Sequence, residues 1–263
     1  MASNLLHLQV NPRNISQDSS NAIHGDDAAK TFGFEGALVP GAELFGYLAR
    51  VAISRWGVAW LNHGRLRAQF KKPVYEGRAA IVEGIPEADA LDLQLRCDGV
   101  ACVVGWAGLP PPGPSPSLDF FKLSAQPDVL PIASEHSLAP GKMLCVPSFP
   151  ISLTDVAVYL RDTEESVSLF ADEGIVPPGM LLRLCNRAVY ENVKLGPWVH
   201  TGSEVINLAP ARAGRVFSAR AFILSNYEHN GHKFIHMDVV IVAGDEPVAR
   251  VMHTAIYELR SNS

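Results

Sequence analysis

The alternation of hydrophobic and polar residues predicts that the first half of the chain folds as one strand, a helix and then four strands. Residues 42–56, directly after Pro40 and Gly41, carry apolar side chains at the spacing of a helix buried on one side. Elsewhere apolar residues recur at every second position, which is typical of strands. The expected strands cover residues 5–10, 61–72, 79–84, 91–96 and 100–107. The Asp98-Gly99 pair predicts a tight turn between the last two. An antiparallel sheet with its helix on one face allows both to bury their apolar sides.

The same pattern recurs 137 residues later, because Val39-Pro40 returns as Val176-Pro177. Further matches at this offset are Asp18 with Asp155, Arg50 with Arg187, His63 with His200, Pro73 with Pro210, and Gly77-Arg78 with Gly214-Arg215. The second half predicts helices over 154–165 and 178–192 and strands over 198–208, 216–225, 234–242 and 248–259. One long offset indicates a duplicated domain rather than a solenoid of short repeats. Two such units placed side by side would continue one sheet and cover an exposed edge.

These patterns divide the chain into a first unit (1–108), a connecting segment (109–150) and a second unit (151–263). Residues 109–116 are rich in proline and are therefore extended and stiff. We expect the whole of 109–150 to cross between the two units, since a structureless loop of that length inside one compact domain is uncommon.

Composition narrows the class of protein. The chain has 263 residues, of which 48% are hydrophobic and 19% charged, so each half can bury a core. A net charge of −5 argues against a nucleic-acid binder. The longest uncharged stretch, residues 99–118, is interrupted by prolines and does not predict a membrane span. Four cysteines without zinc spacing, and no secretory leader, predict a cytoplasmic protein with reduced cysteines and no metal site.

Several short motifs in the first half resemble those of the MaoC-like hot-dog proteins. They are Asn21-x-Ile23-His24-x-Asp26, Gly33-Phe34, Val39-Pro40-Gly41, and the run from Phe70 to Gly77. The resemblance is fainter in the second half, where residues 196–200 and the turn at 210–214 carry it. It implies an α+β fold: a tandem (double) hot-dog in which each unit wraps an antiparallel sheet around a long central helix.

The resemblance also implies an activity, because that family includes R-specific enoyl-CoA hydratases and 3-hydroxyacyl thioester dehydratases. The expected enzyme is a lyase that adds or removes water at an acyl thioester of CoA or an acyl carrier protein. CoA or phosphopantetheine would arrive with the substrate, so no separate cofactor is expected. A homodimer and a partner hot-dog subunit both stay open. The second unit lacks the histidine motif and is expected to be non-catalytic.

The catalytic candidates follow from the family's Asp-x-Asn-Pro-x-His motif. Asn21 and His24 match its Asn and His, whereas Ser19 stands where the Asp belongs and Asp18 lies one position too early. Hydration needs a base for the water and an acid for the α-carbon, which an Asp and a His holding one water supply. We therefore expect His24 and Asn21 in the site, with Asp18 or Asp26 as the acid. For Asp26 a role at the start of a helix is the alternative.

The substrate-binding candidates lie around the start of the long helix. Pro40, Gly41 and Ala42 open this helix, and the backbone N–H groups at its start would stabilise negative charge on the thioester oxygen. Ser19 would face the same space, and Lys71 and Lys72 would meet the phosphates of CoA, unless they belong to a solvated strand face. The paired positions His63 and His200 favour packing or an interface, and His229, His232 and His236 are too weak a pattern for a metal site.

Two other functions remain open from the sequence. Hot-dog thioesterases often use a carboxylate near the long helix, and Glu43 lies in its first turn. A favourable interaction with the helix dipole explains the same residue. The substitution of Ser19 at the Asp position leaves a third hypothesis, a catalytically decayed structural or binding subunit.

Overall fold

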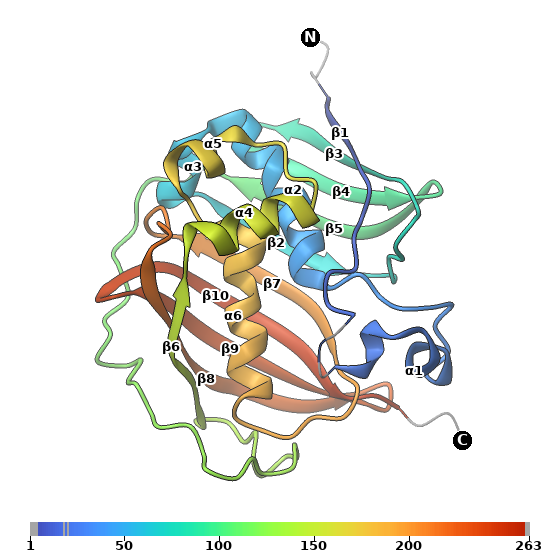
Figure 1. The fold of residues 1–263 in the computed structure, drawn as a ribbon, viewed down its shortest axis with the longest axis vertical. Helices are drawn as coiled ribbons and strands as arrows, with labels where there is room; N and C mark the ends of the chain where they lie inside the picture. The colour runs from blue at the N-terminus through green and yellow to red at the C-terminus, as the bar shows by residue number, and fades with distance from the viewer. Residues whose placement is uncertain (1–4, 18, 20, 261–263) are drawn as a thin grey trace.

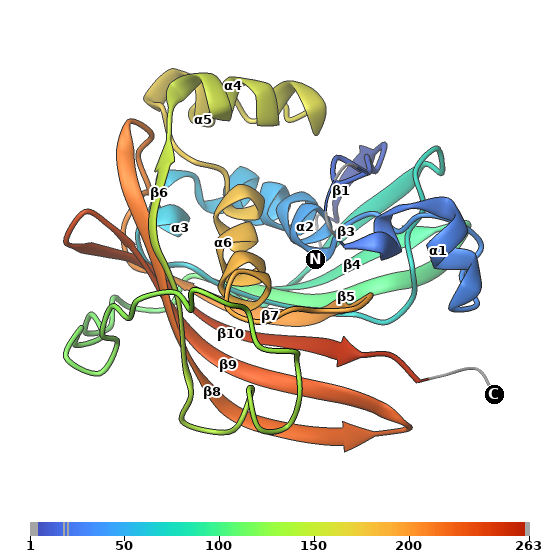
Figure 2. The ribbon, with the colours of Figure 1, turned by 60° about the horizontal axis from the view of Figure 1, so that its bottom comes forward.

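The chain forms one antiparallel sheet that curves around two long helices (Figure 1). The computed structural model describes residues 5–17, 19 and 21–260. The helices α2 (Gly41–Trp56) and α6 (Pro178–Tyr190) lie in the concave face of the sheet, as the turned view shows (Figure 2). The other helices are η1 (Ala22–His24), α1 (Asp26–Thr31), α3 (Val58–His63), α4 (Leu153–Asp162) and α5 (Ser168–Glu173). The strands are β1 (Leu6–Val10), β2 (Arg65–Phe70), β3 (Ala80–Glu87), β4 (Ala90–Cys97), β5 (Val100–Gly108), β6 (Met143–Ile151), β7 (Val199–Asn207), β8 (Arg215–His229), β9 (His232–Ala243) and β10 (Glu246–Glu258).

The order of the strands confirms the duplication. The ten strands run β1-β3-β4-β5-β2-β7-β10-β9-β8-β6, so each half of the sheet repeats the other when read inward from its own edge. Helix α2 starts at Gly41 and α6 at Pro178, which differ by 137. The isolated bridges Leu38–Tyr75 and Ile175–Arg212 differ by the same 137 at both ends. The sequence repeat is therefore a repeat of structure.

The two units join through β2 and β7, which pair antiparallel from Arg65–Ile206 to Gln69–Gly202. This pairing confirms the expectation that two small sheets continue into one and cover each other's edge. Gly202 allows the close approach, because a Cβ there would lie 2.9 Å from the carbonyl oxygen of Ala68.

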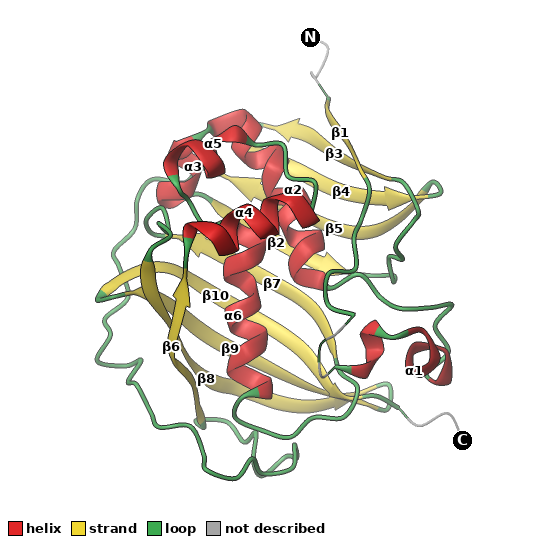
Figure 3. Cartoon of the chain, viewed as in Figure 1, coloured by secondary structure: helices red, strands yellow, loops and turns green. Residues whose placement is uncertain are grey.

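Most expected elements are confirmed, and Figure 3 shows them by type. The turn between β4 and β5 is tight, with positive φ at both Asp98 and Gly99. The strand expected over residues 61–72 was predicted to start too early. Residues 58–63 form helix α3, and strand β2 begins only at Arg65. The neighbours Trp60 and Leu61 are both buried, which a helix end allows but a strand with one buried face does not.

The connecting segment is shorter than expected, because residues 143–151 form β6 of the second unit and pair with β8. Pro147 and Pro150 hid this strand in the sequence. Both are tolerated because β6 is an edge strand, where an N–H is not needed on the open side. The remaining segment passes over the outer face of the sheet, where Phe121 packs on Val240 and Val242.

The two central helices approach closely at the paired glycines Gly46 and Gly179. A Cβ on Gly179 would lie 2.8 Å from the carbonyl oxygen of Ala42 and 3.3 Å from the Cα of Gly46. Helix α4 covers this crossing from the side opposite the sheet (Figure 1, Figure 2). No helix in the described part of the chain is long and apolar enough to cross a membrane.

The helix crossing gives a stability prediction. Gly179→Ala is expected to lower the free energy of unfolding by about 1–3 kcal/mol, because the added methyl group forces two packed helices apart. Urea unfolding followed by circular dichroism measures the change. Gly196→Ala is the matched control, since a Cβ there meets no atom within 4 Å. Equal losses in the two variants would contradict a tight crossing at Gly179.

Candidate active site

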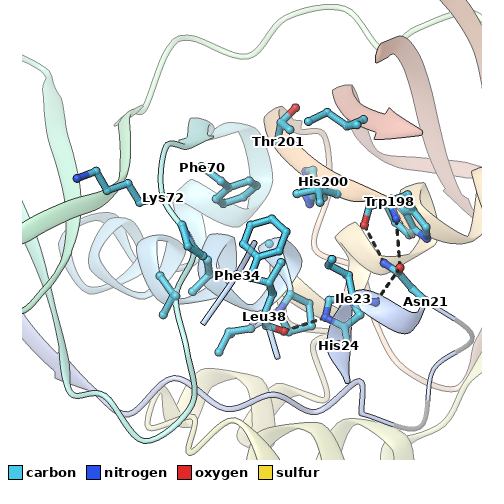
Figure 4. Close-up of a pocket in the computed structure, with 18 of the residues that line it drawn as sticks. Asn21, Ile23, His24, Phe34, Leu38, Phe70, Lys72, Trp198, His200 and Thr201 are labelled. Atoms are coloured by element: carbon cyan, nitrogen blue, oxygen red, sulfur yellow. Dashed lines mark hydrogen bonds between the residues drawn. The ribbon is translucent and has the colours of Figure 1, made fainter. Parts of the chain in front are cut away.

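A cavity of about 230 Å³ opens where the two units meet (Figure 4). Its walls come from η1, the first turn of α2, the turn after β2, and the start of β7, so both units contribute. The lining is mainly apolar and includes Ile23, Phe34, Leu38, Leu44, Phe70, Val74, Trp198, Val199, Ile256 and Leu259. A narrow space of this kind suits an apolar acyl chain or the arm of a thioester.

His24 lines this cavity, and its ring is held in one orientation. The Nδ1 atom lies 2.8 Å from the carbonyl oxygen of Leu38. A carbonyl only accepts, so Nδ1 carries the proton and Nε2 of the neutral ring has a free lone pair. Burial lowers the pKa of His24 below its ordinary value of 6.5, and the charge of Arg183 lowers it further, against the opposing bond to Leu38. His24 is therefore a neutral base at physiological pH.

Asn21 carries the hydrogen bonds that join η1, the turn containing His24, to the second unit. Its side-chain oxygen accepts from the backbone N–H of Ile23 at 3.4 Å and of Trp198 at 3.3 Å, and its amide nitrogen donates to the carbonyl oxygen of Trp198 at 3.0 Å. The close-up shows these bonds (Figure 4). Asn21 thus caps η1 and positions His24, a role that differs from direct participation in the chemistry.

Of the two expected acids, Asp26 is exposed in the first turn of α1, and its Oδ1 accepts from the backbone N–H of Ala37 at 2.7 Å. Asp26 and His24 both line a groove that neighbours the apolar cavity, but Asp26 does not line the cavity itself. Asp26 does not cap α1 either, because the cap position is Gly25 and no side chain bonds to the helix there. Asp18 lies outside the described residues, and Ser19 is exposed on the wall of a second cavity.

This second cavity, of about 290 Å³, also includes His24 and lies between α2 and α6. The two cavities share Asn21, His24, Pro40, Asn186 and Trp198. Glu43 is the one carboxylate among the described residues lining either of them. It is fully buried, and its Oε1 accepts from Nε of Arg183 at 2.6 Å, while Oε2 has no partner among the residues described. Burial raises the pKa of Glu43 against the opposing effect of Arg183.

The start of α2 supplies backbone donors at the wall of the first cavity. The helical bonds begin with Glu43 and Leu44, whose N–H groups donate to the carbonyl oxygen of Pro40. The N–H groups of Gly41 and Ala42 precede this ladder and have no acceptor within the helix. Pro40 and Gly41 line the cavity, and Ala42 lies buried behind them.

Lys71 and Lys72 are exposed at the rim of the cavity, in the turn after β2. Lys72 extends outward in the close-up (Figure 4). No group of three or more His, Cys, Asp or Glu residues in the described ranges is placed to hold a metal ion.

His63 and His200, which occupy matching positions in the two sequence repeats, have different surroundings. His63 is half-buried at the end of α3, where Nδ1 bonds to the carbonyl oxygen of Pro110 at 2.8 Å. His200 lies buried on β7 and lines the cavity. Packing or an interface was expected at both positions, and His200 is buried in a cavity wall where residues of both units meet. The sequence signal for this part of the cavity was the Gly196-Pro197-Trp198-Val199-His200 stretch of the family resemblance.

Comparison with known proteins identifies the architecture. No protein-family model matches the sequence, and no curated protein matches it significantly. A solved structure from Chloroflexus aurantiacus, described as a MaoC domain dehydratase, is 12% identical with a TM-score of 0.63 and covers 99% of this chain and 96% of its own. A Mycobacterium tuberculosis protein described as having a double hot-dog fold is 12% identical with a TM-score of 0.68, over 97% and 96%. The chain is a double hot-dog protein.

The double hot-dog fold confirms the expected architecture and leaves the activity open. A structure from Lactobacillus plantarum described as an oleoyl thioesterase is 9% identical with a TM-score of 0.55, over 98% of both chains. At these identities the likeness shows the fold alone. Dehydratases and thioesterases both use it, so the function of this double hot-dog protein must be argued from its own residues.

Proposed function

We propose that this double hot-dog protein adds water to an enoyl thioester, or removes it from a 3-hydroxyacyl thioester, of CoA or an acyl carrier protein. The observation that carries the proposal is His24, a neutral imidazole that lines an apolar cavity, with Nδ1 bonded to Leu38 and Nε2 without a hydrogen bond among the described residues. That is the form of histidine that general base catalysis requires. The thiol carrier arrives with the substrate, and no further cofactor is invoked.

The geometry supports a short sequence of steps in the hydration direction. Nε2 of His24 takes a proton from water while the water oxygen bonds to the β-carbon. Negative charge moves to the thioester oxygen, next to the N–H groups of Gly41 and Ala42 at the positive end of the α2 dipole. The protonated His24 then returns its proton to the α-carbon, so the atoms of one water are added. Dehydration is the reverse.

The composition and the cysteines support a cytoplasmic location for this activity. All four cysteines are free and buried, as expected for packing residues. Burial raises the pKa of the Cys185 thiol, which makes it a poor nucleophile and favours a packing role.

The experiment follows the absorbance of the conjugated enoyl thioester. The purified protein is mixed with enoyl-CoA substrates of several chain lengths, and free thiol is measured in the same samples. Loss of enoyl absorbance without thiol release is the expected result. No conversion of any CoA or carrier-protein thioester would refute the proposal and favour a decayed binding subunit.

A thioesterase is the second candidate, because Glu43 and His24 line one cavity. A buried carboxylate with a raised pKa could act as a base or nucleophile towards a thioester. Release of free thiol from saturated acyl-CoA, abolished in Glu43→Gln, would favour this function. Against it, Oε1 of Glu43 is already bonded to Arg183.

A further inference from the structure

A buried row of hydrogen-bonded side chains, two histidines and a serine, leads away from the cavity into the second unit. Nε2 of His200 lies 2.9 Å from Oγ of Ser203, and the same Oγ lies 2.9 Å from Nδ1 of His253. The two imidazole rings stack with their centroids 4.2 Å apart. All three side chains are buried, with His200 7% exposed and His253 0%. Polar groups buried this deeply need hydrogen-bond partners.

Each end of this row has a ring nitrogen that lacks a hydrogen-bond partner among the described residues. These atoms are Nδ1 of His200 and Nε2 of His253, and both are buried. Nδ1 of His200 faces the first turn of α2, because a Cβ on Gly41 would lie 2.8 Å from it. The close-up places His200 between Phe70 and Trp198 in the cavity wall (Figure 4). A ligand oxygen at the start of α2 would be the missing partner of His200.

The hydroxyl group of Ser203 links the tautomer of His200 to the tautomer of His253. It has one proton, so it donates to one ring and accepts from the other. If Ser203 donates to Nε2 of His200, then Nδ1 of His200 carries a proton, and Nδ1 of His253 donates to the serine. If Ser203 donates to His253 instead, Nδ1 of His200 is bare. A ligand carbonyl only accepts, so its arrival selects the first arrangement.

We propose that His200 is a catalytic residue that donates a hydrogen bond from Nδ1 to the thioester carbonyl oxygen, with Ser203 and His253 as positioning residues that fix its tautomer. The inference rests on the proposed acyl-thioester function and extends it. His200 and the N–H groups of Gly41 and Ala42 converge on one oxygen from opposite units. The second unit therefore supplies an electrophilic group, although it has no copy of the His24 motif.

A neutral imidazole suits this role. Burial lowers the pKa of His200 to about 3, and burial and the neighbouring His200 ring lower that of His253 well below its ordinary value. Both rings are then uncharged at neutral pH. A neutral donor beside a helix N-terminus polarises a carbonyl without adding a second buried charge, and its proton is not lost to His24.

Three variants test the proposal in the enoyl-thioester assay. His200→Phe keeps the ring and its stacking but removes the donor, and is expected to lower kcat about 10²–10³-fold with KM changed less than threefold. Ser203→Ala is expected to lower kcat about tenfold, because both tautomers of His200 become populated. His63→Gln is the matched control, a half-buried histidine bonded to the carbonyl oxygen of Pro110 away from His200, Ser203, His253 and the cavity, and should leave kcat unchanged.

A second measurement does not depend on variant folding. Nitrogen NMR of the histidine-labelled parent protein, with and without an unreactive oxoalkyl-CoA analogue that keeps a carbonyl oxygen, reports the tautomer of each ring. Binding is expected to give a protonated Nδ1 and a bare Nε2 at His200. Binding without any change at His200, or full kcat in a folded His200→Phe, would overturn the proposal. A parent protein that binds the analogue and shifts His200 but converts no enoyl thioester would refute the hydratase while retaining His200 as a ligand contact.

Discussion

His24→Ala is expected to lower kcat/KM for hydration of an enoyl thioester by about 10²–10⁴-fold, the usual contribution of one general base. The variant loses the free Nε2 and keeps the apolar cavity, so KM should change little. Its folded state loses one hydrogen bond, to Leu38, which costs about 1 kcal/mol. Stopped-flow or steady-state absorbance at the enoyl band gives both constants.

His63→Ala is the control for this experiment, because His63 bonds to a backbone carbonyl in the same way but lies outside the cavity. It should retain the parent rate. The parent should also show a pH signature. Since His24 acts as a base and its pKa is lowered, kcat/KM should stay high as the pH drops through 6.5 and decline only below it. Equal rates in His24→Ala and the parent would remove His24 from the mechanism.

Acid should unfold the protein steeply, because two buried histidines are held neutral. In the unfolded chain both bind a proton near pH 6.5, whereas in the folded chain the pKa of His200 is about 3 and that of His253 is well below normal. At these two rings the unfolded state binds more protons throughout this window, so their contribution to stability decreases as the pH decreases. With a folded-state pKa of about 3, His200 alone contributes about 2–3 kcal/mol between pH 6.5 and 4.5, and His253 adds to the loss in the same direction.

That loss is a large fraction of the stability of many domains, so the midpoint of urea unfolding should move between pH 7.5 and 5. The matched variant is His253→Gln, which keeps a polar side chain opposite Ser203 but cannot bind the proton. Its free energy of unfolding should depend on pH less steeply than the parent's. Identical slopes would show that His253 accepts a proton without unfolding.

The sequence predicted the fold well because its signals were local and repeated. Period-two alternation placed the strands, Asp98-Gly99 placed a hairpin turn, and the 137-residue offset made each half a check on the other. The errors came where another force decided the structure. Trp60 and Leu61 form a helix end because both must be buried, and the prolines of β6 are tolerated only because that strand lies at an edge.

The site was harder to predict, because its walls come from segments far apart in the sequence. His24 was predicted from its motif. Asn21 was predicted too, but only the structure shows that its amide is bonded to Trp198, 177 residues away. Residues 196–200 carried part of the family resemblance, but nothing in them showed that His200 would line the cavity while His63 would not. The difference depends on β7 joining β2 across the seam, which places His200 against the start of α2.

The seam between β2 and β7 has a consequence for how the protein can change. In a symmetric homodimer every substitution appears twice, once in each of two equivalent grooves, and the assembly dissociates on dilution. Here the halves are tethered, so their association is unimolecular and independent of concentration. A substitution in one half can then change one groove and leave the other as it was, which a pair of identical subunits cannot do.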